Sequence, residues 1–256
     1  MATYSSFISA FVSADQTKTF RVLIYGNPGS GKTSLAGSFP KPLIIDTDKG
    51  LRSLASNTNA DIKVFSLPSN PSAPVFNTIY TLLNDARMGQ GDFAPNGPLA
   101  DRQTIVIDTI SALADEYLLR EIMLQNKRDP LVDKAQFDDY GRLKTELSQI
   151  GNLLKDVSQK FYVVVTALVD EEKDELTGAL EGKPLMTGKY RDLIGGVFDE
   201  EYYLEVIDTG AAPKYVLYAT KYRWYEAKTR LLKVNKLENP SFAVLQQNLR
   251  IPAKTT

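Results

Sequence analysis

The chain has 256 residues, 43% of them hydrophobic, and a formal net charge of −1, which suits one large or two small domains and predicts no bulk attraction to nucleic acid or anionic membrane. It contains no Cys and no His, which excludes disulfides and thiolate metal sites and removes the commonest general base. No apolar run is long enough to span a bilayer and the N-terminus has no signal-peptide pattern, so we expect no membrane partner and a cytoplasmic location.

Residues 1–19 are predicted to form a polar arm ahead of the first core strand. The arm carries two Phe-x-x-Ala steps, Phe7 with Ala10 and Phe11 with Ala14. In such a step the Phe can fill one pocket while the small Ala sits close to a second. The arm either docks onto a neighbouring subunit or covers its own domain, and the sequence leaves both alternatives open.

A phosphate-binding loop follows the apolar run at residues 20–25. Its Gly-x4-Gly-Lys-Thr spacing stands between a predicted strand and a helix at residues 34–39, which is the setting of a P-loop. Glycines let backbone N–H groups curl around phosphate oxygens, and the helix N-terminus adds positive potential. Lys32 can reach the outer phosphates, and the Thr33 hydroxyl can hold Mg²⁺. The sequence therefore predicts ATP and Mg²⁺ binding by Gly26, Asn27, Pro28, Gly29, Ser30, Gly31, Lys32, Thr33 and Ser34.

The stretch Thr104–Thr109 is predicted to be a Walker B strand. Four β-forming residues run into Asp108, whose carboxylate would meet Mg²⁺ through water at the carboxyl edge of the sheet. The alternative is an ordinary acidic residue at the end of a strand. The position of Asp108 downstream of a P-loop, with a strand–helix unit between them, favours the metal.

The rest of the core is predicted as alternating strands and helices, which indicates a parallel, doubly wound sheet. The predicted strands are 43–48, 62–65 and 161–166, and the predicted helices are 75–88, 111–125 and 138–157. Residues 169–191 contain three Gly residues and six acidic against four basic residues, so a mobile loop is predicted there.

From Glu201 onward the chain is predicted to form strands without helices, at 202–207, 215–220 and 230–234. A parallel core extended by antiparallel strands at its C-terminal end favours an α/β RecA-type P-loop NTPase core. An AAA+ module would instead follow its core with a helical lid. The predicted organisation is an arm at 1–19, an ATPase core at 20–236 and a C-terminal tail at 237–256.

Several stretches together resemble the phage nucleotide-binding proteins of the RecA-core single-strand annealing family, over roughly residues 20–235. These stretches are 22–33, 43–50, 105–109, 139–141 and 227–230. The resemblance implies an oligomeric ATPase, as a ring or a filament, that binds single-stranded DNA and promotes annealing or strand exchange in DNA recombination. It also implies work beside a single-strand binding protein and, for a phage-encoded chain, in the cytoplasm of the host bacterium.

The resemblance also implies catalytic roles. Lys32 and Thr33 take the phosphate and Mg²⁺ positions, and Asp108 takes the Walker B position. Asp48 matches the second acid of a RecA stretch that positions the attacking water, although RecA carries the longer Glu; a strand-end carboxylate or a cap for the following turn is the alternative. Thr166 ends the strand where RecA-like proteins keep a polar sensor of the γ-phosphate. The Phe-x-x-Ala steps resemble the anchor by which RecA and Rad recombinases dock onto a neighbouring subunit.

Three segments are candidates for binding DNA. RecA-like proteins hold single strands with two loops, here 120–136 and 169–191, and neither is strongly basic. The segment 214–236 carries seven basic residues against the single acid Glu226, with five interleaved aromatic residues, which suits sequence-tolerant single-strand binding. Those aromatics could equally be core residues. Lys228 and Arg230 remain open between DNA contact, action on the γ-phosphate of a neighbouring subunit, and plain surface.

Two other functions are compatible with parts of the sequence. A nucleotide-switched assembly or partner-binding module with little turnover fits the same P-loop. A small-molecule kinase ranks last, because the strands predicted after the core leave no place for a lid with clustered arginines.

Overall fold

The computed structural model describes residues 19–56, 61–67, 74–173, 175, 178–187, 190–210 and 212–250. The two predicted Phe-x-x-Ala steps, Phe7 with Ala10 and Phe11 with Ala14, lie outside the described residues. Within the described ranges, no helix combines the length and the apolar character needed to cross a membrane.

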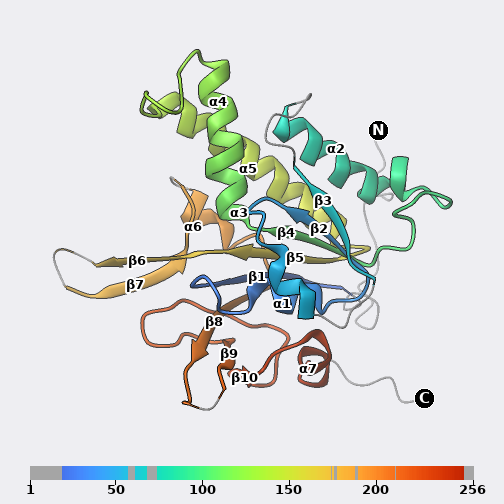
Figure 1. The fold of residues 1–256 in the computed structure, drawn as a ribbon, viewed down its shortest axis with the longest axis vertical. Coiled ribbons are helices and arrows are strands. Elements are labelled where there is room, and N and C mark those ends of the chain that lie inside the picture. The colour runs from blue at the N-terminus through green and yellow to red at the C-terminus, as the bar shows by residue number, and fades with distance from the viewer. Residues whose placement is uncertain are drawn as a thin grey trace, which may run out of the picture.

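An eight-stranded sheet forms the centre of the fold (Figure 1). Its strand order is β10-β9-β8-β1-β5-β4-β2-β3. The six strands from β8 to β3 are parallel to their neighbours, whereas β9 pairs antiparallel with both β8 and β10. The strands are β1 (Arg21–Gly26), β2 (Pro42–Asp46), β3 (Lys63–Ser66), β4 (Thr104–Asp108), β5 (Tyr162–Ala167), β8 (Glu200–Ile207), β9 (Lys214–Tyr218) and β10 (Lys236–Glu238). The predicted parallel core with an antiparallel extension is confirmed.

Helices cover both faces of this sheet (Figure 1). They are α1 (Lys32–Gly37), α2 (Val75–Met88), α3 (Ile110–Ala112), a π-helix (Leu113–Leu119), α4 (Arg120–Gln125), α5 (Phe137–Val157), α6 (Arg191–Ile194) and α7 (Phe242–Gln247), with 3-10 turns at Leu51–Ser56 and Gly91–Phe93. The apolar side chains of α2, of the helices from α3 to α5, and of α6 form one core with one face of the sheet, and those of α1 and α7 form a second core with the other.

Local sequence explains most of these boundaries. Every residue of β2 and of β4 is buried, as expected for parallel strands covered on both faces. Helix α2 ends at Gly89, whose φ of 70° is the left-handed conformation that glycine adopts easily. Helix α5 begins with a capping box between Gln136 and the buried carboxylate of Asp139, which also accepts hydrogen bonds from Asn126 (2.6 Å) and Arg128 (2.5 Å). Asp139 therefore fixes the α4–α5 connection.

The prediction of a loop at residues 169–191 is wrong. Its first part is a two-stranded antiparallel hairpin of β6 (Val169–Lys173) and β7 (Leu180–Pro184) that projects away from the central sheet (Figure 1). Arg191 offsets the acidic charge of β6, because its guanidinium lies 3.1 Å from Asp170 and 2.6 Å from Glu172. The hairpin is therefore stabilised by a residue that lies outside its own two strands.

The prediction of a strand at residues 230–234 is also wrong, and among the described residues the last strand is β10. The chain from Thr229 instead curls around the buried carboxylate of Glu200, which accepts hydrogen bonds from the backbone N–H groups of Arg230 and Leu231. Beyond residue 236, which the sequence assigned to a tail, α7 packs on the core. The ring centroid of Phe242 lies 4.7 Å from that of Phe39.

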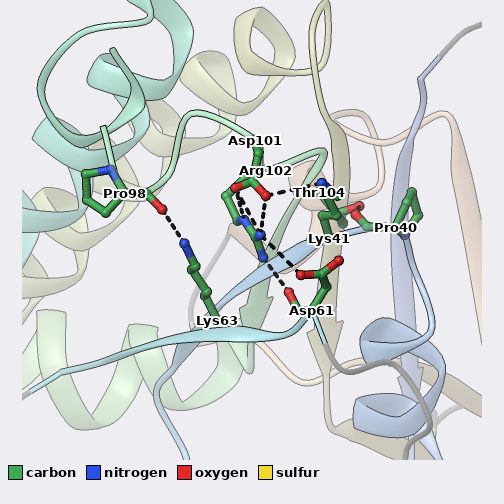
Figure 2. Close-up of polar contacts among 8 residues, drawn as sticks. All are labelled: Pro40, Lys41, Asp61, Lys63, Pro98, Asp101, Arg102 and Thr104. Atoms are coloured by element: carbon green, nitrogen blue, oxygen red, sulfur yellow. Dashed lines mark hydrogen bonds and ion pairs between the residues drawn. The ribbon is translucent and has the colours of Figure 1, made fainter. Parts of the chain in front are cut away.

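The amino edge of the sheet is held together by a buried arginine (Figure 2). The Arg102 side chain is 1% exposed, and its Nη2 lies 2.9 Å from the Asp101 carboxylate and 3.9 Å from that of Asp61. Its Nη1 donates to the Asp61 carbonyl, and nearby Thr104 donates to the Pro40 carbonyl at 2.7 Å. These contacts connect the segments that lead into β2, β3 and β4, and so stabilise the amino edge of the sheet. The P-loop lies at the opposite, carboxyl edge.

Candidate nucleotide site

The predicted phosphate and metal residues come together at the carboxyl edge of the sheet. The strand register places Asp46 of β2 beside Asp108 of β4, and Ile24 of β1 beside Thr166 of β5. Strand β1 ends at Gly26, where the P-loop begins. Four neighbouring strands thus deliver their last residues to one edge, where ligands bind in open α/β sheets.

The P-loop is shaped by its glycines and spanned by its lysine. Gly29 and Gly31 have φ values of 79° and 92°, which residues with a Cβ rarely adopt. The Lys32 ammonium is buried and donates hydrogen bonds to the carbonyl oxygens of Gly26 (2.8 Å) and Asn27 (2.9 Å). Burial lowers the pKa of Lys32 to about 8, although the negative charges of Asp108 and Asp48 oppose the change. The negative charge of a bound phosphate would stabilise the charged form of Lys32.

Two threonine hydroxyls hold the Asp108 carboxylate. Thr33 donates to its Oδ2 at 2.8 Å, and Thr166 donates to its Oδ1. Asp108 is fully buried, and burial raises its pKa even though both hydrogen bonds favour the ionised form. A carboxylate and a hydroxyl beside a phosphate cradle are a donor set that Mg²⁺ accepts together with phosphate oxygens and water. These residues fit the ion.

The two acids after β2 have different surroundings. Asp46 is buried, which raises its pKa, and its Oδ1 accepts a hydrogen bond from the Lys49 N–H at 2.9 Å. Asp48 is exposed and accepts from the Gly50 N–H at 2.8 Å, which matches the predicted capping of the following turn. Its charge nevertheless acts on Lys32 and Asp108, so Asp48 also lies within electrostatic reach of the site.

Lys228 and Arg230 lie away from the P-loop of their own chain. The backbone of Lys228 pairs with that of Glu201, at 2.9 Å in both directions, and Glu201 lies beside Leu23, three residues before Gly26. The Lys228 ammonium donates to the Gly195 carbonyl, whereas Arg230 is exposed. Within one chain the structure does not bring these cations to the phosphate site.

The basic, aromatic segment at 214–236 is largely engaged within the protein. Lys214 pairs with Glu238 at 2.7 Å, and Lys221 pairs with Glu226 at 2.6 Å. Two of its five aromatic residues, Tyr218 and Tyr225, are buried. Tyr225 stacks on Tyr203 and Tyr218 on Tyr222, each pair with ring centroids 3.7 Å apart. The alternative that these aromatics belong to the core therefore holds for the two buried tyrosines.

Sequence reasoning missed Ser111, which ties the site to the β6–β7 hairpin. Its hydroxyl donates to the Leu185 carbonyl at 2.8 Å and accepts from the Leu168 N–H at 3.1 Å. Ser111 stands on α3, two residues after Thr109, whose side chain caps that helix. A Ser just beyond a Walker B aspartate is the only signal in the sequence, and it is a weak one.

The sequence profile of a family described as an AAA domain matches residues 18–231. The chain belongs to this family of P-loop NTPases. In the described part of this AAA domain, antiparallel strands rather than a helical lid follow the parallel core. No curated protein matches the sequence.

Solved structures with a similar arrangement include a KaiC-like protein from the archaeon Pyrococcus horikoshii and the RadB recombinase. The first is 12% identical, with 86% of this chain and 89% of that chain covered, and the TM-score is 0.46. The second is 15% identical, with 86% of each chain covered, and the TM-score is also 0.46.

Proposed function

We propose that this AAA domain is a Mg²⁺-dependent ATPase that binds single-stranded DNA and promotes annealing or strand exchange. The observation that carries the ATPase is the convergence of Lys32, Thr33, Asp108 and Thr166 at one edge of the sheet. The DNA activity goes further and is supported by the resemblance to phage annealing proteins.

The chemistry of the site follows from its residues. The backbone N–H groups of the P-loop and the Lys32 ammonium bind and orient the triphosphate. Thr33 and Asp108 would hold Mg²⁺, which when bound neutralises negative charge on the phosphate oxygens. Thr166 keeps the Asp108 carboxylate oriented, because its hydroxyl occupies the second carboxylate oxygen. Asp48, exposed at the rim, would position a water and accept its proton.

Single-stranded DNA would meet the same edge of the sheet. The β6–β7 hairpin begins at Val169, three residues after Thr166, and the connection between α4 and α5 follows the helices that start after Asp108. In an oligomer, the exposed Arg230 and the neighbouring Lys228 would contact DNA or the nucleotide of the adjacent subunit. The hairpin carries net negative charge and no aromatic residue, so Arg230 and Lys228 rather than the hairpin would supply the contacts with DNA phosphates.

Two measurements test the proposal. Lys32→Ala should abolish tight MgATP binding in calorimetry, whereas Lys144→Ala, an exposed lysine on α5, should leave it unchanged. Steady-state ATP hydrolysis should rise with a long unstructured single strand and not with the matching duplex. Unchanged ATP affinity in Lys32→Ala would reject the P-loop assignment, and equal rates with both DNAs would reject the DNA role.

The hydrogen bond from the Gly50 N–H to Asp48 favours a second candidate, a nucleotide-switched module with little turnover. In that case Asp48 shapes the turn and activates no water. Asp48→Asn keeps the turn acceptor and should cut turnover sharply in an ATPase but change little in a switch. Asp92→Asn, an exposed acid distant from the P-loop, is the matched control.

A further inference from the structure

Thr47 stands between the two acids that follow β2, and both of its polar groups bind the end of β4. Thr47 is buried, whereas the next residue, Asp48, is exposed. The Thr47 N–H donates to the Asp108 carbonyl at 2.9 Å, which extends the pairing of β2 with β4 by one residue. The Thr47 hydroxyl donates to the Thr109 carbonyl at 2.7 Å. The chain that leaves β2 is therefore fastened to the strand that carries Asp108.

The turn that carries Asp48 is also held from within. The Asp46 Oδ1 accepts from the Lys49 N–H at 2.9 Å, and the Asp48 Oδ1 accepts from the Gly50 N–H at 2.8 Å. Lys49 has a φ of 57°, a left-handed conformation that is unfavourable for most residues with a Cβ. Such a conformation persists only where the surrounding contacts hold it. The backbone on both sides of Asp48 is therefore fixed.

The place of the Asp48 carboxylate matters for the proposed chemistry. Its negative charge acts on both the Lys32 ammonium and the Asp108 carboxylate. A group that takes a proton from water must lie within hydrogen-bond reach of that water. A misplacement of about 1 Å can lower the rate about 100-fold. Because Asp has one methylene fewer than Glu, the position of its carboxylate depends more strongly on the backbone that carries it.

Only one of these contacts depends on the side chain of Thr47. Any residue other than proline could donate its N–H to the Asp108 carbonyl, but the bond to the Thr109 carbonyl needs a hydroxyl. That carbonyl lies where β4 ends and α3 begins, because the Thr109 side chain accepts from the Ala112 N–H at 3.2 Å and caps the helix. The Thr47 hydroxyl thus joins the turn that carries Asp48 to a fixed point beside Asp108.

We propose that Thr47 is a positioning residue for ATP hydrolysis, which holds Asp48 in a fixed place relative to Asp108 through its bond to the Thr109 carbonyl. Because Thr47 is buried, it acts through Asp48 and not on the nucleotide itself. The inference rests on the proposed ATPase function and adds to it a hydroxyl that sets the rate of hydrolysis without taking part in nucleotide binding.

The test is a double-mutant cycle on steady-state turnover at saturating MgATP. Thr47→Val removes the hydroxyl at nearly constant volume and should lower kcat about 10- to 100-fold. Its affinity for the Mg²⁺ complex of a non-hydrolysable ATP analogue, measured by calorimetry, should not change. Thr47→Ser keeps a hydroxyl and should retain most of the turnover. In the Asp48→Asn background, Thr47→Val should cause no further loss, because the residue through which Thr47 acts is already inactive.

Two further variants make the comparison secure. Thr145→Val is the matched control, because the exposed Thr145 hydroxyl also donates to a backbone carbonyl, that of Gly141 at 3.1 Å, but within α5. This variant should hydrolyse ATP as the wild type does. Circular dichroism checks that each variant is folded. If Thr47→Val does not fold, Thr47→Ala provides the same comparison, because it leaves room for a water at the Thr109 carbonyl.

The outcomes separate this inference from the proposed function. An unchanged kcat in folded Thr47→Val would overturn the inference, as would an equally large loss in Thr47→Ser. A further loss in the Asp48→Asn background as large as in the wild type would overturn it too, because Thr47 would then act independently of Asp48. Failure of the wild-type protein to hydrolyse ATP, or undiminished hydrolysis by Asp48→Asn, would instead reject the proposed function of the site, and the inference with it.

Discussion

Glu200 should be one of the most important single residues for the stability of this fold. Its carboxylate is fully buried at the start of β8 and accepts four hydrogen bonds. The donors are the Tyr202 hydroxyl (2.6 Å), the Thr229 hydroxyl (2.5 Å) and the backbone N–H groups of Arg230 (2.7 Å) and Leu231 (3.0 Å). Glu200→Ala leaves all of them without this acceptor.

The expected loss of stability depends on how many of these four donors water can reach once the carboxylate is removed. An unsatisfied buried donor costs about 1–3 kcal/mol, and the Tyr202 hydroxyl has no access to solvent. The segment from Thr229 to Leu231 is partly exposed, so water replaces some of the lost bonds there. Removing the buried charge also recovers part of its desolvation cost. We therefore expect Glu200→Ala to lower the free energy of unfolding by about 3–5 kcal/mol, or the midpoint of thermal unfolding by about 10 °C.

Urea denaturation followed by circular dichroism measures this loss directly. Glu200→Gln retains one carbonyl oxygen, so its loss should fall between the wild type and Glu200→Ala. Glu238→Ala removes a surface partner of Lys214 and should cost far less, because an exposed ion pair contributes little to stability. If Glu200→Ala lost no more than Glu238→Ala at an unchanged denaturant slope, the buried network would not stabilise the fold and the reasoning would be refuted.

Three further predictions concern protons, the metal residues and the amino edge. Burial lowers the pKa of Lys32 to about 8 and bound triphosphate should raise it again, so ATP binding near pH 9 should take up about one proton and weaken as pH rises further. Calorimetry in buffers of different ionisation enthalpy measures this, and ATP binding at pH 9 without proton uptake contradicts it. Thr166→Val removes a donor to Asp108 at nearly constant volume and should lower Mg²⁺-dependent ATP turnover about 10- to 100-fold in steady-state assays, with an unaltered rate as the contrary result. Arg102→Leu should lower the free energy of unfolding by about 2–3 kcal/mol at neutral pH. Hydrogen bonds from Arg102 and Lys41 hold the pKa of Asp101 far below its usual range, a stabilisation present above about pH 4 and lost as pH falls, so the urea midpoints of variant and wild type should converge in acid, and a constant gap would contradict this.

The sequence predicted the elements whose signals are local. Helix α2 has the predicted bounds, Val75–Met88, because its apolar period and the glycine that directly follows it are both local signals. The P-loop and Asp108 were found because their spacing, and the strands around them, are fixed by phosphate chemistry. In the structure Thr33 donates a hydrogen bond to Asp108, and the roles of both residues toward Mg²⁺ stay predictions.

The sequence could not predict features that depend on distant partners. The acidic strand β6 is held by Arg191 and by its pairing with β7, and neither is visible in its own composition. Leu231 and Leu232 suggested a strand, but the buried acceptor of Glu200, 31 positions earlier than Leu231, curls that segment instead. Asn239 lay in a predicted tail, because its contact with Tyr215 spans 24 positions. The roles proposed for Asp48, Lys228 and Arg230 stay predictions.

The β6–β7 hairpin is anchored at its roots by the hydroxyl of Ser111 and along its strands by other parts of the chain. Both roots of the hairpin, Leu168 and Leu185, bond this one side chain and each other. Each strand has five residues, an arm of about 16 Å. Along that length the Gly182 N–H donates to the Trp224 carbonyl at 2.9 Å, and the Tyr225 hydroxyl donates to Glu171. The hairpin therefore bridges α3, which follows Asp108, and the aromatic segment that precedes Lys228, so a displacement of α3 would be resisted by both sets of contacts.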